Sequence, residues 1–196
     1  MAVSTLISMS LFALAASLSP GPVNLVGVIS GARFGVRVGC YFVTGATLGF
    51  IALFLLIGFG LQQIVGLIPQ LMEYIKWAGV AFLLYVSLQL IRDSGELSDQ
   101  GRTSAPTPWL GAVMQWLNPK AWLASIAGIA AYTHQAEASA VWVFAGIYLV
   151  ICWLSLMAWV LLGAWISDWL SSPRRIRVLN RMLALGLVLS CFAIFY

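Results

Sequence analysis

The stretches IALFLLI (residues 51–57) and WLSLMAWVLL (residues 153–162) decide the fold class, because each is almost continuously apolar. They belong to longer hydrophobic segments that recur along the chain, and about 18 or more such residues in a helix span a hydrocarbon core of about 30 Å. Of the 196 residues, 62% are hydrophobic and 8% are charged, whereas roughly a quarter are charged in soluble domains. A transmembrane β-barrel would alternate polar and apolar residues instead. The sequence therefore predicts an all-α, polytopic membrane protein.

We expect six transmembrane helices, which together form one domain over residues 1–196. The segment of residues 92–108 is polar and charged, as is typical of a solvated linker, and it separates halves of about residues 1–91 and 109–196. Each half has three helices, an odd number, so the two halves enter the membrane in opposite directions. The expected spans are Thr5–Gly31, Val38–Val65, Leu71–Ile91, Trp109–Tyr132, Ser139–Trp165 and Val178–Phe195.

The arginines predict the orientation, since short loops rich in Lys and Arg stay on the cytoplasmic side. They gather in the turns after the first, third and fifth expected spans, whereas the opposite turns carry only Lys76. We therefore expect those arginine-rich turns, and the linker, to be cytoplasmic and both termini to lie outside. The arginines are Arg33, Arg37, Arg92, Arg102, Arg174, Arg175, Arg177 and Arg181.

Proline interrupts the first and the fourth expected spans. In the first, Pro20 and Pro22 lack backbone N–H groups and flank Gly21, so the helix is expected to break or kink there. In the fourth, Pro119 follows Asn118 and frees the carbonyl of Gln115. At about 1.5 Å per residue, both breaks lie roughly 15–18 Å from the cytoplasmic ends of their helices, near the bilayer midplane. Paired breaks in corresponding helices of inverted halves indicate a transporter's substrate site.

Lys120 is the basic residue that lies firmly within a span. A charge near the bilayer centre is costly, so its side chain should face the bundle interior or water, where a substrate carboxylate would be a suitable partner. Asn24, Gln115 and Asn118 can supply neutral hydrogen bonds beside it. The predicted substrate-binding residues are Pro20, Gly21, Pro22, Asn24, Gln115, Asn118, Pro119 and Lys120.

Several other functions are disfavoured. The single histidine and the three isolated cysteines offer no cluster for a metal or a redox pair, and we interpret the cysteines as packing residues. We see no clustered His/Asp/Glu or Ser/His site, so we expect no enzyme and no cofactor. No basic run on a soluble face points to nucleic acid. A passive channel that uses the same breaks, or a structural membrane protein that transports nothing, stays open as an alternative.

Glycines repeat every four residues around the first turn. They are Gly27, Gly31, Gly35 and Gly39, and Gly45 and Gly49 continue the pattern. Such spacing lets helix backbones approach closely. We expect it to serve mainly packing, with a homodimer through these faces as a further possibility.

Four motifs resemble the LysE/RhtB family of amino-acid exporters, and since their spacing and the length of 196 residues agree with that family, the resemblance covers essentially the whole chain. They are SPGPVN (residues 19–24), SGARFGVRVG (30–39), GATLGF (45–50) and QWLNPKAW (115–122). The closing Ile194-Phe195-Tyr196 and the motif variants are similar to the branch that exports cysteine and O-acetylserine.

The resemblance implies a secondary active exporter of amino acids or close derivatives in the bacterial inner membrane, driven by the proton motive force. It would work by alternating access around the paired breaks, with protons as the coupling ion. By motif position, the resemblance also implies that Pro20, Pro22, Asn24, Asn118, Pro119 and Lys120 line the pathway. Val23 departs from the family pattern, in which a polar Asn is frequent at that position, so the resemblance does not identify the particular substrate.

Overall fold

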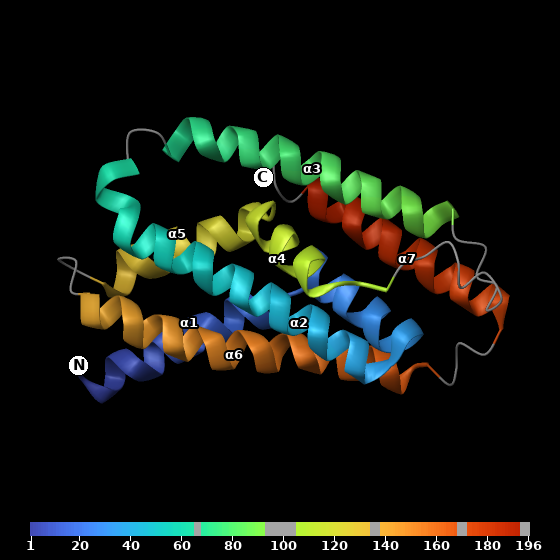
Figure 1. The fold of residues 1–196 in the computed structure, drawn as a ribbon, viewed down its shortest axis with the longest axis horizontal. Helices are drawn as coiled ribbons and strands as arrows, with labels where there is room; N and C mark the ends of the chain where they lie inside the picture. The colour runs from blue at the N-terminus through green and yellow to red at the C-terminus, as the bar shows by residue number, and fades with distance from the viewer. Residues whose placement is uncertain (65–67, 93–104, 134–137, 168–171, 193–196) are drawn as a thin grey trace.

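The computed structural model describes residues 1–64, 68–92, 105–133, 138–167 and 172–192. This part of the chain contains seven α-helices and no strand (Figure 1). The all-α prediction is therefore confirmed. The helices are α1 (Val3–Leu18), α2 (Pro22–Ile64), α3 (Ile68–Arg92), α4 (Pro108–Trp116), α5 (Pro119–Tyr132), α6 (Ala138–Trp165) and α7 (Pro173–Phe192).

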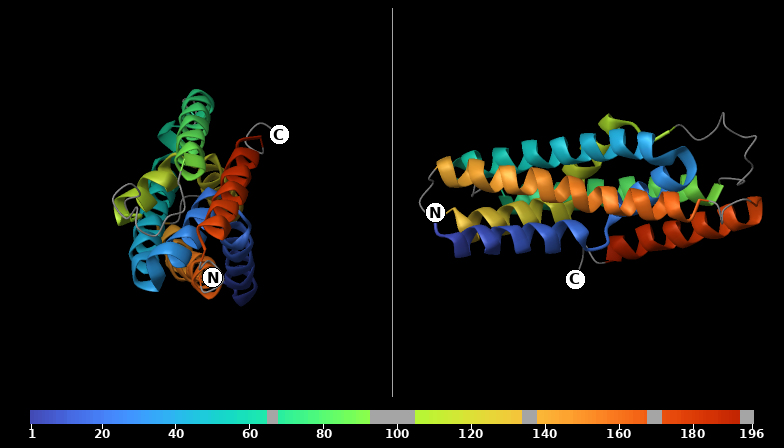
Figure 2. Two further views of the ribbon diagram at one scale, coloured as in Figure 1. Left: turned by 90° about the vertical axis from the view of Figure 1, so that its right-hand side faces the viewer. Right: turned by 90° about the horizontal axis from the view of Figure 1, so that it is seen from below.

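The long helix α2 is two arms joined at Gly35. Gly35 has φ 80° and ψ 171°, a conformation that glycine adopts without the steric cost that a side chain would impose. The chain turns back there, as the blue-to-cyan ribbon of Figures 1 and 2 shows. The turn predicted between the first two spans is thus confirmed: α1 and the first arm (residues 22–34) correspond to the first span, and the second arm (residues 36–64) to the second.

Glycines bring α2 against α6 and α4. A Cβ on Gly31 would collide with the backbone oxygen of Val160 in α6, and one on Gly45 would collide with Pro108 at the start of α4. The predicted close packing is therefore confirmed, with partners inside the chain. Gly31 and Gly45 are covered within the chain. A homodimer through the glycine faces stays a prediction.

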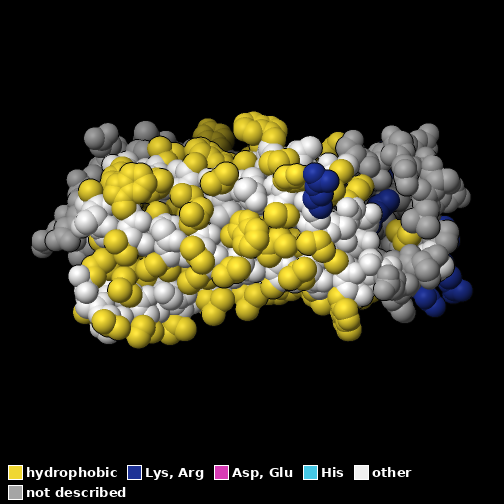
Figure 3. Space-filling model, turned by 60° about the horizontal axis from the view of Figure 1, so that its bottom comes forward, with side chains coloured by type: hydrophobic (Ala, Val, Ile, Leu, Met, Phe, Trp, Pro, Cys, Tyr) yellow, Lys and Arg dark blue, Asp and Glu magenta, His cyan; other side chains and the backbone are white. Residues whose placement is uncertain are grey.

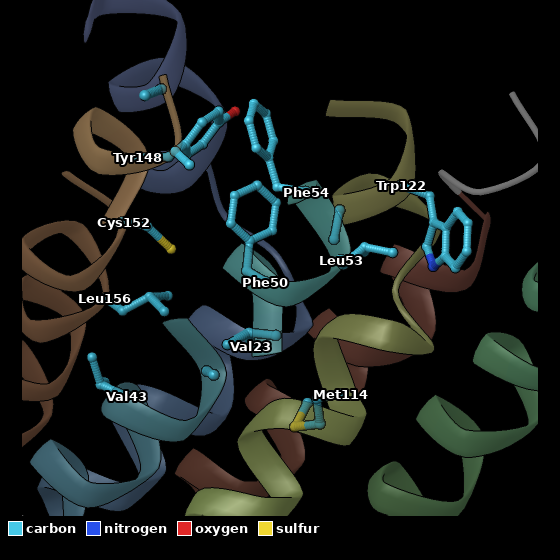
Figure 4. Packing of buried hydrophobic residues seen from close by; sticks show 14 of the residues in the cluster. Val23, Val43, Phe50, Leu53, Phe54, Met114, Trp122, Tyr148, Cys152 and Leu156 are labelled. Atoms are coloured by element: carbon cyan, nitrogen blue, oxygen red, sulfur yellow. The ribbon is translucent and has the colours of Figure 1, made fainter. Parts of the chain in front are cut away.

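The buried core lies where α6 faces the second arm of α2. Tyr148 and Phe144 of α6 pack against Phe50 and Phe54 of α2, with ring centroids 4.7 Å apart for Phe50 and Tyr148 and 5.2 Å apart for Phe54 and Phe144. Figure 4 shows Tyr148, Phe50 and Phe54 of this cluster. Phe12 of α1 adds an edge-on contact to the Tyr148 ring at 6.4 Å. Aromatic pairs at such distances stabilise a core beyond the area that they bury.

Helices α3 and α7 lie side by side along one edge of the molecule, as Figure 1 shows. Ser87 of α3 donates a hydrogen bond of 3.1 Å to the carbonyl of Ala184 in α7. Leu83, Ala184 and Leu187 bury an apolar cluster against Ile29 of the first arm of α2. This pair of helices is therefore attached to the arm that follows the first break.

The outer surface is largely apolar. Hydrophobic side chains cover the face drawn in Figure 3, and its Lys and Arg side chains gather towards one end. Over the whole surface, many large apolar side chains are exposed, among them Leu123, Leu154 and Trp165. Among the described helices, Pro22–Gly60 and Ala138–Trp165 are long and apolar enough to cross a membrane by length and composition. Soluble monomers rarely expose so much contiguous apolar surface, so the surface agrees with a membrane protein.

One sequence expectation needs adjustment. The sixth span was expected from Val178, but α7 begins at Pro173, so Arg174, Arg175 and Arg177 lie in its first turns rather than in a loop. Proline is favoured at the first position of a helix because it needs no N–H partner there, which explains the earlier start. Most of the expected linker (residues 93–104) lies outside the described residues.

Candidate functional site

The first predicted break lies between α1 and α2 and is confirmed. Helix α1 ends at Leu18, and α2 starts at Pro22. A broken helix leaves its last carbonyls without helical partners, and here other groups satisfy all four. Ala15 accepts from the Ser19 N–H at 3.2 Å, Ala16 from Ser19 Oγ at 3.1 Å, Ser17 from Asn24 Nδ2 at 3.0 Å and Leu18 from Trp159 Nε1 at 3.3 Å.

Lys120 completes the termination of α1 from the other half of the chain. Its Nζ donates to the Ser19 carbonyl at 2.8 Å, to Ser19 Oγ at 2.7 Å and to the Pro20 carbonyl at 3.4 Å. The ammonium group thus lies at the negative end of the α1 dipole, where a cation is favoured. Lys120 is therefore half-buried and hydrogen-bonded inside the bundle, as the sequence predicted.

The second break separates α4 from α5 and is also confirmed. Helix α4 ends at Trp116, and α5 begins at Pro119 with Asn118 as its N-cap. The Asn118 Oδ1 accepts from the Lys120 backbone N–H at 3.1 Å, which satisfies one free donor of the new helix. Trp122 Nε1 donates to the Trp116 carbonyl at 2.8 Å. An indole N–H therefore satisfies a freed carbonyl at each of the two breaks.

The two breaks meet at one cavity. Its volume is about 40 Å³, which suffices for water but is far below the roughly 300–1,000 Å³ of pockets for drug-sized ligands. Residues of α1, α2, α4, α5 and α6 surround it. They are Ala16, Ser17, Val23, Asn24, Phe50, Gln115, Asn118, Lys120, Ala121, Ala124, Tyr148, Cys152 and Leu156.

The cavity has an electropositive side and no acidic lining residue. Lys120 brings its ammonium group, and Val23 and Asn24 lie in the first turn of α2, where the helix dipole is positive. Amide groups of Asn24, Gln115 and Asn118 add hydrogen-bonding capacity. Such a combination of a cation, a helix N-terminus and neutral amides suits a small carboxylate.

The structure brings half of the predicted site residues together at the cavity. Asn24, Gln115, Asn118 and Lys120 all line it. Pro20, Gly21 and Pro22 lie at the first break and are not among the lining residues. A Cβ on Gly21 would lie 3.5 Å from Lys120 Nζ, so the missing side chain leaves room for the ammonium group.

Pro119 is the fourth predicted residue that does not line the cavity. It is buried, and its Cδ would lie 3.3 Å from a Cβ on Gly79 of α3. Pro119 therefore begins α5 and packs towards α3. Its effect on the site is to shape the backbone that carries Asn118 and Lys120.

The sequence interpretation missed the wall that α6 contributes. Tyr148 and Cys152 both line the cavity, and the Cys152 thiol lies beside the hydroxyls of Ser17 and Thr47. Cys152 points from α6 towards Phe50 in Figure 4. The spacing of four residues, which places two side chains on one helix face, was the available signal. Both residues also suit ordinary packing, so this spacing alone does not indicate a site.

The Tyr148 hydroxyl is buried and has no hydrogen-bond partner among the described residues. A buried hydroxyl without a partner costs on the order of 1–3 kcal/mol.

Ser19 and Trp159, which donate hydrogen bonds to free carbonyls at the first break, were also not predicted as site residues. Ser19 borders the Pro-Gly-Pro segment, but nothing in the sequence links Trp159 to it.

Comparisons with known proteins point to transport. The family model described as "LysE type translocator" matches residues 14–196. Similar curated proteins include the cysteine/O-acetylserine efflux proteins of Salmonella typhimurium (strain LT2), Salmonella choleraesuis (strain SC-B67) and Escherichia coli O1:K1. Each is 26% identical over 191 residues, which covers 94% of this chain and 94% of the relative. No solved structure matches the chain.

Proposed function

Because the chain belongs to the LysE type translocator family, we propose that it is a secondary active exporter of amino acids or close derivatives in the bacterial inner membrane. The observation that carries the proposal is the cavity at the meeting point of the two helix breaks, with Lys120 hydrogen-bonded across it. Backbone groups freed at breaks can bind a polar solute that lipid cannot solvate. Paired helix breaks beside a polar cavity are typical of the substrate sites of transporters.

The proposed membrane arrangement has six spans in two inverted halves. In the first half, α1 with the first arm of α2, the second arm of α2, and α3 each cross once. In the second, α4 with α5, then α6, then α7 do so. Each half then opens with an interrupted span. The apolar outer surface supports this assignment, since such a surface is stable in lipid.

Lys120 and the end of α1 together suit a zwitterion. A substrate carboxylate would replace the Ser19 and Pro20 carbonyls as the partner of the Lys120 ammonium group, because hydrogen bonds between charged groups are the stronger ones. Those carbonyls would then be free to accept from the substrate's own ammonium group. The exchange leaves no polar group unpaired, so an amino acid fits better than a simple anion or cation.

Alternating access would follow from the same exchange. The bond between Lys120 and Ser19 joins the second half to the first across 101 positions of sequence. A cavity of about 40 Å³ has to widen before an amino acid enters. Breaking this bond on substrate binding would let the two halves separate on one side of the membrane. A proton gradient would then drive net transport of the substrate out of the cell.

The test is counterflow of radiolabelled amino acids in proteoliposomes, with and without an imposed pH gradient. Cysteine and O-acetylserine are the first solutes to use, since the relatives are named for them. We expect saturable exchange that a proton gradient drives uphill and that Lys120→Ala abolishes. Leu123→Ala is the matched control, since Leu123 lies on the same helix with an exposed side chain.

The outcomes separate the competing functions. Flux that saturates but never exceeds equilibrium under a pH gradient would indicate a passive pathway. Absence of exchange for every amino acid, with protein correctly inserted, would contradict the exporter. Normal transport by Lys120→Ala would remove Lys120 from the site while leaving the family assignment in place.

A further inference from the structure

The exposed side of α7 changes from basic to apolar along the helix. Its first turns carry the exposed residues Arg174, Arg177 and Arg181, which are three and four residues apart and therefore lie on one side of the helix. Leu185 and Leu189 continue the same side and are exposed as well. The other side of α7 is buried against α3 and the first arm of α2, so this basic row faces away from the bundle.

No carboxylate of α7 balances the row, because the helix carries four arginines and no acidic residue. In the part of the chain that the structure describes, the single acidic residue is Glu73, near the start of α3. Helix α3 contacts α7 through Ser87, near its opposite end. Asp168 and the acidic residues of the linker lie outside the described residues. The basic row therefore attracts an anion from outside the described bundle.

Apolar side chains share the surface with the deeper arginines of the row. Val178 and Met182 directly follow Arg177 and Arg181, and they are 45% and 65% exposed. A guanidinium group binds a phosphate through two parallel hydrogen bonds, whereas exposed apolar side chains need an apolar partner. The ligand that satisfies both is a molecule with an anionic phosphate head and an acyl tail.

We propose that the basic row of α7, defined as Arg174, Arg177 and Arg181, binds the head group of an anionic phospholipid, whose acyl chain packs on Val178 and Met182. This inference rests on the proposed membrane arrangement, in which α7 crosses the bilayer, and it does not depend on the substrate. Soluble phosphate would pair with the arginines but leave the apolar side chains uncovered. The bound lipid would thus cover the outer side of α7 where that side changes from basic to apolar.

Lipid binding to the purified full-length protein in detergent tests the proposal. The probes are dioleoyl phosphatidylglycerol and dioleoyl phosphatidylcholine, which differ in head-group charge, and native mass spectrometry measures the lipid-bound fraction. One basic residue near an anionic lipid surface changes affinity by about fivefold. We therefore expect phosphatidylglycerol to bind wild-type protein at least tenfold more tightly than phosphatidylcholine. Arg174→Gln combined with Arg181→Gln should weaken phosphatidylglycerol binding about ten- to thirtyfold and leave phosphatidylcholine binding unchanged.

The matched control removes the same charge elsewhere. Arg33→Gln combined with Arg37→Gln, at the Gly35 turn, should keep the preference for phosphatidylglycerol. An equal loss in this control would indicate attraction by net charge alone and overturn the proposal. Displacement of the lipid by an equimolar amount of inorganic phosphate would indicate a site for a soluble anion and overturn it as well.

A single substitution keeps the test valid if the double variant cannot be purified. Arg181→Gln alone should lose about fivefold in phosphatidylglycerol affinity, and unchanged binding would contradict the proposal. Arg181→Lys keeps the charge and should retain most of the affinity. Since binding is measured without transport, a protein that exchanges no amino acid but prefers phosphatidylglycerol would contradict the exporter and support the lipid site.

Discussion

Lys120 Nζ lies 2.8 Å from the carbonyl oxygen of Ser19, although 101 positions separate the two residues in the chain. The bond joins the start of α5 to the end of α1, so each of the two breaks supplies one partner. A helix end inside a bundle needs partners for its free carbonyls, and a buried cation needs acceptors. Each break therefore satisfies the requirement that the other creates, and together they keep a polar cavity within an apolar protein.

Trp159 should contribute to the same termination of α1. Its indole N–H donates to the Leu18 carbonyl at 3.3 Å, and Trp159→Phe removes that donor while keeping most of the aromatic surface. We expect the free energy of unfolding to fall by about 1 kcal/mol, which lowers the melting temperature in detergent by about 2–4 °C. Trp142→Phe is the control, since Trp142 is exposed and packs on Phe59. An equal loss in both variants would contradict a specific role for the Trp159 N–H.

The contact between α6 and the first arm of α2 should not tolerate a methyl group at Gly163. A Cβ there would collide with the backbone oxygen of Val28, and backbone moves less readily than a side chain. Gly163→Ala is expected to destabilise the protein by about 1–3 kcal/mol or more, seen as lower yield and a lower melting temperature. Gly146→Ala lies on the same helix with nothing within 4 Å of the new Cβ. That control should be neutral or slightly stabilised, because alanine favours helix over glycine.

The positions of the helices could largely be predicted from the sequence, because apolar run length and proline report directly on a helix in lipid. The four polar residues at the breaks could be predicted for the same reason: Asn24, Gln115, Asn118 and Lys120 sit beside prolines in otherwise apolar segments. Neither the bond from Lys120 to Ser19 nor the role of Trp159 could be predicted. Both depend on how distant helices pack, and an indole in an apolar segment is equally suited to lipid.

Tyr148 and Cys152 illustrate the same limit on α6. That helix is apolar along its whole length, with buried and exposed residues of similar hydrophobicity, so the pattern does not mark an inward face. Only the contacts with Ser17, Thr47 and Phe50 identify these two residues as cavity wall. The face of a lipid-embedded helix that meets a site is therefore set by packing partners that periodicity does not reveal.

Cys152 should react with maleimides only when the cavity opens, since it is 4% exposed. In a Cys40→Ala, Cys191→Ala background it is the single thiol. We expect slow modification by N-ethylmaleimide that transported amino acids slow further, because a bound substrate occupies the space beside the thiol. A single cysteine at Leu154, which is exposed, is the control and should be insensitive to substrate. Modification of Cys152 at one rate with and without substrate would place the transport pathway elsewhere.

The arginines predict that the carboxyl terminus lies outside the cytoplasm. In the structure, the Gly35 turn with Arg33 and Arg37, the end of α3 with Arg92 and the start of α7 lie at the same end of the molecule (Figure 1). Short basic segments are retained on the cytoplasmic side. The opposite ends of the spans, including the end of α7, should therefore face the periplasm.

Reporter fusions after Tyr196 test this orientation. Alkaline phosphatase, which needs the disulfides that form in the periplasm, should be active there, and a fluorescent protein that matures in the cytoplasm should be dark. Replacing Arg174, Arg175, Arg177 and Arg181 of α7 by glutamine removes half of the eight arginines, so it should increase the fraction of inverted molecules and lower the phosphatase activity. The matched control replaces an exposed apolar residue of the same helix, Leu185, by alanine and should leave the ratio of the two reporters unchanged. A fluorescent wild-type fusion without phosphatase activity would reverse the orientation, and with it the direction in which a proton gradient drives transport.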